Sequence, residues 1–166
     1  MNRDAPGAPE PLPQVRAAAD AALAAGVWPE DVDWYLDRLE DLGLLLGAVP
    51  LTAVGSPRWA VPVGGSRRGG CVMWAQPGQG ERVADLLAGR IGFPDVRVGH
   101  DLEQGGGMVC WGEDEPPTPA WEAPDLEWVR EIVATGRLYG YRSAAIRAFA
   151  AERWGAALAD EAMRHP

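Results

Sequence analysis

The chain contains no lysine, so all fifteen of its basic residues are arginine. Arginine carries a planar guanidinium with five N–H donors, a group that binds carboxylate and phosphate through two parallel hydrogen bonds. Alanine, glycine, proline and valine are abundant in the same chain, and coding bias in a high-G+C genome explains both features together. The absence of lysine therefore identifies no chemistry by itself.

Cysteine is also scarce, since Cys71 and Cys110 are the only two in 166 residues. Two cysteines make no disulfide framework, and their spacing is not that of a zinc site. Long apolar runs are absent, so no segment is suited to cross a membrane. The N-terminus lacks the basic-then-apolar order of a secretory signal. We therefore expect a cytoplasmic protein with no membrane contact, no metal ion and no cofactor.

Basic residues are fewer than acidic ones, which gives the chain a net charge of −9. This charge is unevenly distributed along the sequence. Residues 1–55 hold three arginines against nine acids, and residues 101–166 hold six against twelve. Residues 56–100 reverse the sign, with six arginines against three acids. An acidic chain argues against duplex nucleic acid as a partner, because that requires a broad basic surface. The basic middle segment nevertheless suits a local anion site.

The chain length fits one domain with its own core. Residues 1–12 are rich in proline, which predicts a disordered tail before a single domain over residues 13–166. Apolar residues at helical spacing predict helices near both ends, with the clearest stripe between positions 32 and 46. The predicted helices cover residues 14–25, 29–46, 81–91 and 125–135, and a last one runs from Ser143 to position 158.

The segment from Trp59 to Trp74 is the one around which we expect the fold to be organised. Apolar side chains alternate on both sides of a glycine-rich middle, as in two strands of a sheet. The pattern predicts a β-hairpin in which Val61 lies opposite Val72 and Trp59 lies opposite Trp74. Residues 64–70, with four glycines around two arginines, would form its tip.

A second hairpin is predicted over residues 95–100 and 108–112, with Val98 opposite Val109. The predicted helix over residues 81–91 lies between the two hairpins in the sequence. This order of elements predicts an α+β fold, with a mostly antiparallel sheet from two β-hairpins joined by a helix. The N- and C-terminal helices are expected to pack against that sheet.

Four short segments stand out as a set: residues 60–70, 92–98, 111–113 and 136–141, the last followed by an Ala-Ile pair at 145–146. Together they resemble an uncharacterised family of small actinobacterial proteins of unknown function. The resemblance extends over about residues 30–150 and implies no activity, cofactor or catalytic residue. In one departure, Arg and Ser follow the second tyrosine in place of the serine and acid of the family pattern.

The predicted tip of the first hairpin is the leading candidate for a binding site. Arginine forks bind carboxylate and phosphate, and glycines bring backbone amides close to a ligand. Nothing in the packing of the hairpin needs the two arginines, so their side chains are expected to be exposed. We hypothesise a small binding or regulatory protein that engages a protein partner or a small anion through Gly65, Ser66, Arg67, Arg68 and Gly69.

A second candidate is the aromatic turn that precedes the last predicted helix. Arg137, Tyr139 and Tyr141 combine the side-chain types that anchor protein partners or planar ligands. The alternative is a packed corner between two helices with no binding role. Both interpretations stay open from the sequence.

An enzyme with a cysteine nucleophile is the main alternative function. Cys71 or Cys110 would act with His100 as a base and Asp101 to orient it. In the register of the second predicted hairpin, however, His100 and Cys110 point to opposite faces of the sheet. Buried small hydrophobic side chains are the usual role of such cysteines. We therefore assign no catalytic residue, and a nucleic-acid-associated factor is a further alternative.

Overall fold

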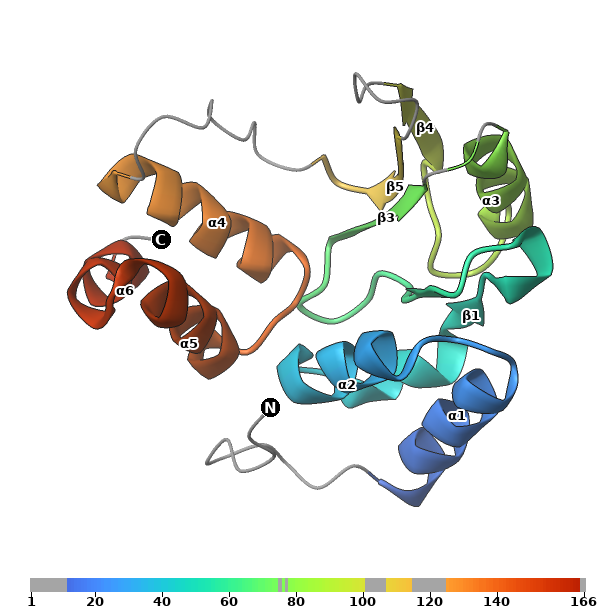
Figure 1. The fold of residues 1–166 in the computed structure, drawn as a ribbon, viewed down its shortest axis with the longest axis horizontal. Coiled ribbons are helices and arrows are strands. Elements are labelled where there is room, and N and C mark those ends of the chain that lie inside the picture. Colours follow the sequence, from blue (N-terminus) through green and yellow to red (C-terminus); the bar gives the residue numbers. More distant parts are fainter. Residues whose placement is uncertain (1–11, 75, 77, 101–106, 115–124, 165–166) are drawn as a thin grey trace.

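The computed structural model describes residues 12–74, 76, 78–100, 107–114 and 125–164. It has the predicted α+β class, with helices around two small antiparallel sheets (Figure 1). All but the last residue of the predicted tail, and Asp101 as well, lie outside the described residues. The helices are α1 (Pro13–Ala24), α2 (Pro29–Arg38), α3 (Gln79–Leu87), α4 (Leu126–Leu138), α5 (Ser143–Trp154) and α6 (Ala156–Met163), with 3₁₀-helices η1 (Leu42–Gly47) and η2 (Thr52–Val54).

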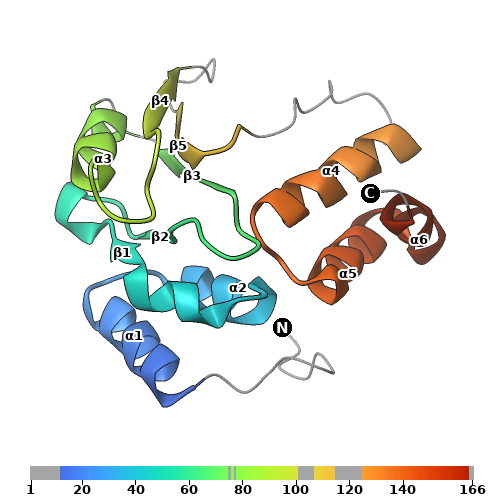
Figure 2. The same cartoon turned by 180° about the vertical axis from the view of Figure 1, so that it is seen from behind.

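The elements form three groups, each with its own hydrophobic core (Figures 1 and 2). The N-terminal unit holds α1, α2 and η1, and the C-terminal unit holds α4, α5 and α6. The sheet unit consists of α3 on one face of a three-stranded sheet. The largest fully buried side chains of the three cores are Leu39, Leu45 and Trp59 in the first, Leu51, Leu87 and Trp111 in the second, and Val129 and Val133 in the third.

The predicted hairpin from Trp59 to Trp74 is wrong. Strand β2 (Trp59–Ala60) pairs with β1 (Val49–Pro50), so Trp59 lies opposite Pro50 and not opposite Trp74. Strand β3 (Gly69–Trp74) joins another sheet, where Val72 lies opposite Val109. Pro62 has no N–H to continue a ladder after β2, and the chain then turns back on itself over Gly64–Arg67.

The alternation that suggested the hairpin is nevertheless present in the structure. Trp59 and Val61 are buried in the N-terminal core, while Ala60 between them is buried in the core of the sheet unit. These three residues lie between the N-terminal helices on one side and the sheet unit on the other, and both sides need apolar contacts. The period of two was therefore correct, and the pairing partner was not.

The second predicted hairpin is confirmed. Strand β4 (Arg97–His100) pairs with β5 (Gly107–Gly112), and Val98 lies opposite Val109. The strand order is β3-β5-β4, so β5 is central and antiparallel to both neighbours. Along β5, buried residues alternate with partly buried ones, because one face packs on α3 and the other faces away from it.

Two predicted helices end earlier than their apolar stripes indicate, because the backbone geometry changes within the stripe. The predicted helix over 29–46 breaks at Leu39, which forms a bridge with Tyr141, and continues as the separate helix η1. The last predicted helix breaks at Gly155, whose φ of 92° separates α5 from α6. Among the described residues, no helix is long and apolar enough to span a bilayer.

The close contact between Gly70 and Trp111 gives the first prediction. A Cβ at Gly70 would lie 2.5 Å from ring atoms of Trp111, a fully buried side chain whose Nε1 donates to the Val61 carbonyl at 3.1 Å. Gly70→Ala should therefore lower the free energy of unfolding by about 1–3 kcal/mol, as overpacked cores do. Urea denaturation followed by fluorescence measures this change.

Gly99→Ala is the matched control in the same sheet. A Cβ there would meet nothing closer than the Met108 carbonyl oxygen at 3.4 Å, which is ordinary contact. We expect the free energy of unfolding of this variant to change by no more than about 0.5 kcal/mol, as for uncrowded surface positions. Equal stability of the two variants would show that the Trp111 ring is not held in this position.

Candidate ligand-binding pocket

Arg67 is buried, which contradicts the expectation of an exposed arginine tip. Only 2% of the residue is exposed, because the turn at Gly64–Arg67 closes with two reciprocal backbone hydrogen bonds of 2.9 Å and directs the side chain inward. Its Nε donates to the Val61 carbonyl at 3.3 Å and its Nη1 to the Tyr139 carbonyl at 2.7 Å. The Tyr141 hydroxyl also lies close enough for Arg67 to lower its pKa.

Arg68, by contrast, keeps the predicted exposure. Its side chain is 57% exposed and pairs with Glu113 at 2.8 Å. Its backbone connects two units, since the Arg68 N–H donates to the Leu138 carbonyl and the Arg68 carbonyl accepts from Glu113. The two neighbouring arginines therefore have different environments, one inside the protein and one at its surface.

The other predicted tip residues divide in the same way. Gly65 and Ser66 are exposed at the outside of the turn, and Gly65 has a φ of 55° that favours glycine. Gly69 is buried at the start of β3, where a Cβ would lie 2.7 Å from the Glu113 carbonyl oxygen. Of the predicted tip, Arg67 is the residue whose side chain lines the cavity described below.

The aromatic corner between α4 and α5 packs directly on this turn. A Cβ at Gly140 would lie 2.7 Å from the Cβ of Arg67, and Gly140 has a φ of 66°, so both the space and the backbone require glycine there. The rings of Tyr139 and Tyr141 meet edge to face with centroids 6.0 Å apart. The structure thus joins two regions that the sequence analysis treated as separate candidates.

Arg137 does not belong to this site, although it was predicted with the two tyrosines. Its Nη2 donates to the carbonyl of Met163 at 3.2 Å, so it holds α6 against α4. It lies in the last turn of α4, two positions before Tyr139, and its side chain is directed to the C-terminal unit.

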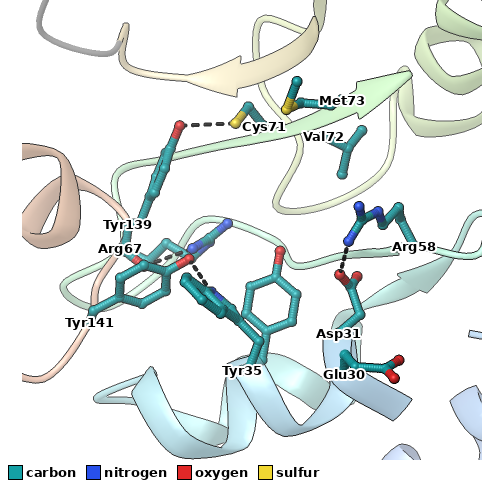
Figure 3. Close-up of a pocket in the computed structure, with 11 residues that line it drawn as sticks. Glu30, Asp31, Tyr35, Arg58, Arg67, Cys71, Val72, Met73, Tyr139 and Tyr141 are labelled. Atoms are coloured by element: carbon teal, nitrogen blue, oxygen red, sulfur yellow. Dashed lines mark hydrogen bonds and ion pairs between the residues drawn. The ribbon is translucent and has the colours of Figure 1, made fainter. Parts of the chain in front are cut away.

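A cavity of about 360 Å³ opens between α2, the turn, β3 and the aromatic corner (Figure 3). Its walls are largely aromatic, and Arg67 lies among them with the Tyr141 hydroxyl turned toward it. A volume of this size is within the range of small-molecule sites. The lining side chains are Glu30, Asp31, Trp34, Tyr35, Arg58, Arg67, Cys71, Val72, Met73, Tyr139 and Tyr141.

The charged side chains around the cavity differ in whether a group of opposite charge lies beside them. Asp31 accepts from Arg58 at 2.7 Å and from the Trp59 N–H at 2.9 Å, so its carboxylate is paired. For Arg67, no carboxylate of the described residues lies within ion-pair distance. Its hydrogen-bond acceptors among the described residues are two neutral carbonyls, those of Val61 and Tyr139.

The pKa values of two phenols in the cavity, those of Tyr35 and Tyr141, are raised, which disfavours their ionisation. Burial raises the pKa of Tyr35 far above its usual range, and the nearby Arg67 offsets only part of that shift. Burial also raises the pKa of Tyr141, against the opposing effects of Arg67 and of the hydrogen bond from Trp34 Nε1 at 3.0 Å. These hydroxyls therefore stay protonated at neutral pH and act as neutral hydrogen-bonding groups.

Helix α2 contributes half of the pocket-lining residues that the sequence analysis did not identify. Tyr35 was assigned to the apolar stripe of the core, and Asp31 and Trp34 were assigned no role. A tyrosine within a stripe of aliphatic residues is a signal that a polar atom is needed at that depth. That signal pointed to Tyr35, while nothing in the sequence pointed to Asp31.

The cysteines lie together, but not with the predicted histidine partner. Cys71 and Cys110 are directly opposite each other on β3 and β5, without a disulfide. The Tyr139 hydroxyl donates to the Cys71 sulfur at 3.0 Å. His100 pairs with Gly107 at the far end of β4, three positions from the Arg97–Cys110 pair.

Fold and site together define a small α+β protein with an aromatic pocket around a buried arginine. Residues 25–165 match the model of a family of unknown function, DUF6302. The chain belongs to this family, as the resemblance in the sequence analysis indicated. No curated protein and no solved structure matches the chain.

The contrast between the two arginines gives a second prediction. Arg67→Ala should lower the free energy of unfolding by about 1–3 kcal/mol, because it removes the Arg67 donor from the Tyr139 carbonyl and one of the two donors from the buried Val61 carbonyl, which keeps that of Trp111. Arg68→Ala should change it by no more than about 0.5 kcal/mol, since exposed ion pairs contribute little. Denaturation curves of the two single variants, measured side by side, test the difference, and equal losses would contradict the burial of Arg67.

The raised pKa values predict a loss of stability in alkaline solution. The unfolded chain begins to lose tyrosine protons near pH 10, whereas the folded chain retains those of Tyr35 and Tyr141 to higher pH. The unfolded state is therefore favoured increasingly as pH rises above about 10. Tyr35→Phe should make this decline shallower in urea titrations at several pH values, and an unchanged slope would show that Tyr35 titrates normally.

Proposed function

We propose that the protein binds a small organic monoanion, with an aromatic body and one carboxylate, in the pocket around Arg67. The observation that carries this proposal is Arg67, a residue that is 2% exposed, lines a cavity, donates to neutral carbonyls and has no carboxylate of the described residues within ion-pair distance. A buried cation is costly without an anion nearby. A ligand carboxylate would supply that anion.

The donors and walls of the pocket fit such a ligand. A guanidinium has five N–H donors, more than the two carbonyl acceptors described for Arg67 require. Trp34, Tyr35, Tyr139 and Tyr141 offer ring faces and edges for a planar body. Aromatic pairs of this kind contribute about 0.5–1.5 kcal/mol beyond the area they bury.

The acidic side of the cavity favours a single negative charge. Glu30 and Asp31 lie on α2 at the edge of the pocket. Of these two carboxylates, that of Asp31 forms an ion pair with Arg58. A multiply charged phosphate would be repelled by these carboxylates. We therefore place a monocarboxylate ahead of a phosphate.

Other functions have less support from the geometry. An arginine that lines a cavity supports a ligand, whereas docking a partner would favour a protruding arginine, and the exposed Arg68 is already paired with Glu113. A cysteine nucleophile would use Cys71, whose sulfur accepts from the Tyr139 hydroxyl, whereas His100 lies at the far end of β4. The net charge of −9 argues against nucleic acid. A cytoplasmic location and an actinobacterial source remain our predictions.

Benzoate is the first probe for the pocket. Titrations followed by calorimetry and by tryptophan fluorescence should show binding of benzoate at least tenfold tighter than that of benzamide, its neutral isostere. The reason is that a hydrogen bond to a charged group contributes about 1.5–3 kcal/mol, and each 1.4 kcal/mol is a factor of ten. Cyclohexanecarboxylate, an anion without a planar ring, should also bind more weakly.

Two matched variants locate the site. Arg67→Met should reduce benzoate affinity at least tenfold, and Arg68→Met should leave it unchanged. If Arg67→Met does not fold, Tyr35→Leu tests the same pocket from α2. Benzamide binding as tightly as benzoate, or equal effects of the two arginine variants, would overturn the proposal.

A further inference from the structure

Both cysteines and two of the four methionines of the chain lie on adjacent positions of one sheet face. The sequence Cys71-Val72-Met73 of β3 runs antiparallel to Met108-Val109-Cys110 of β5. The two triplets mirror each other, so the register places cysteine opposite cysteine and methionine opposite methionine. Directly paired residues share a face, and so do residues two apart along a strand.

The face that carries the sulfurs is the one turned away from α3. Val72 and Val109 between them are buried in the core of the sheet unit. Cys71, Met108 and Cys110 are partly buried, and Met73 is 60% exposed. In Figure 3, Cys71 and Met73 lie side by side above the pocket. The four sulfur side chains therefore form a two-by-two array that solvent can reach.

The pairing type brings the opposite side chains close. The Glu113 N–H donates to the Arg68 carbonyl at 3.0 Å, which makes that pair a hydrogen-bonded one. Pairs alternate along an antiparallel ladder, so Cys71–Cys110 and Met73–Met108 are non-hydrogen-bonded pairs, with Cα atoms about 4.5 Å apart and side chains closer together. Gly99, opposite Met108 on β4, adds no side chain over the array.

We propose that Cys71, Met73, Met108 and Cys110 bind one Cu(I) ion. Thiolate and thioether sulfurs are soft ligands that select Cu(I), and the array contains no histidine or carboxylate of the kind that zinc sites usually include. The flexible methionine side chains can adjust their sulfurs to one ion. On binding, each thiol releases its proton to solvent as its sulfur bonds to the metal, and no electron is transferred.

Two neighbouring groups support the thiolates. The Tyr139 hydroxyl donates to the Cys71 sulfur at 3.0 Å, which is how groups around a metal site orient its ligands. Arg97 lies opposite Cys110 on β4, and its guanidinium is held by Asp114 and by the Gly112 carbonyl. The cation at the edge of the array offsets the charge of two thiolates around a singly charged metal ion.

Anaerobic titration of the reduced protein with Cu(I), in competition with a chromogenic Cu(I) chelator, tests the site. We expect one Cu(I) per chain, with two protons released to a weakly buffered solution. The Cys71→Ser/Cys110→Ser double variant should lose binding, and Met73→Leu/Met108→Leu should weaken it at least tenfold. Met163→Leu on α6 is the matched control and should bind like the unaltered protein.

The wild-type protein also provides a test that does not depend on the folding of any variant. X-ray absorption at the copper edge should show a first shell of four sulfurs. Absence of binding, a shell of two sulfurs, or affinity that survives the double methionine change would each overturn the proposal. Displacement of Cu(I) by an equal concentration of Zn(II) would do so as well. Benzoate binding in metal-free protein is measured separately, so each proposal can fail without the other.

Discussion

One buried guanidinium connects the three units of the protein. Arg67 donates to the carbonyl of Val61, next to β2, and to the carbonyl of Tyr139, after α4. Its charge also lies 5.9 Å from the centre of the Tyr35 ring on α2 and 5.4 Å from that of Tyr139. Because a desolvated cation needs all of these neutral partners at once, this side chain couples the positions of the elements that supply them, in addition to the backbone bridge between Leu39 and Tyr141.

The same requirement explains why the cavity lies where it does. Each unit fills its own core with aliphatic and aromatic side chains, whereas the junction between units must also accommodate a charge and several hydroxyls. Polar groups with fixed directions pack less completely than alkyl groups, so open volume remains at the junction. Binding surfaces are common at such junctions for this reason.

The sequence predicted the fold class and much of the secondary structure. The hairpin of β4 and β5, with Val98 opposite Val109, followed from simple alternation because the two strands lie close together in the sequence. The first hairpin failed because alternation reports which residues share a face, and Trp59 and Val61 do share one. It does not report which strand lies alongside. Strand β1 precedes β2 by as many residues as β3 follows it, and β2 pairs with β1, while β3 pairs with β5, which is distant in the sequence.

The candidate site was predicted in parts and misjudged as a whole. The arginine tip and the aromatic corner were both identified, but 72 residues separate Arg67 from Tyr139, and no local pattern joins positions so far apart. The burial of Arg67 had no sequence signal either, since glycines on both sides usually indicate an exposed turn. Asp31 and Arg58, an ion pair 27 residues apart, were missed for the same reason.

The backbone bridge between Leu39 and Tyr141 has a consequence for the protein during its synthesis. Glu40 and Arg142 donate to the carbonyls of Gly140 and Arg38 across this bridge, so α2 meets the aromatic corner only after the ribosome has added that corner. The N-terminal core needs nothing beyond Val61 for its fully buried residues. At about 5–20 residues per second, the nascent chain waits roughly 4–16 s between these events. During that interval Arg67 remains in water, and the cavity has no wall on the side of the two tyrosines.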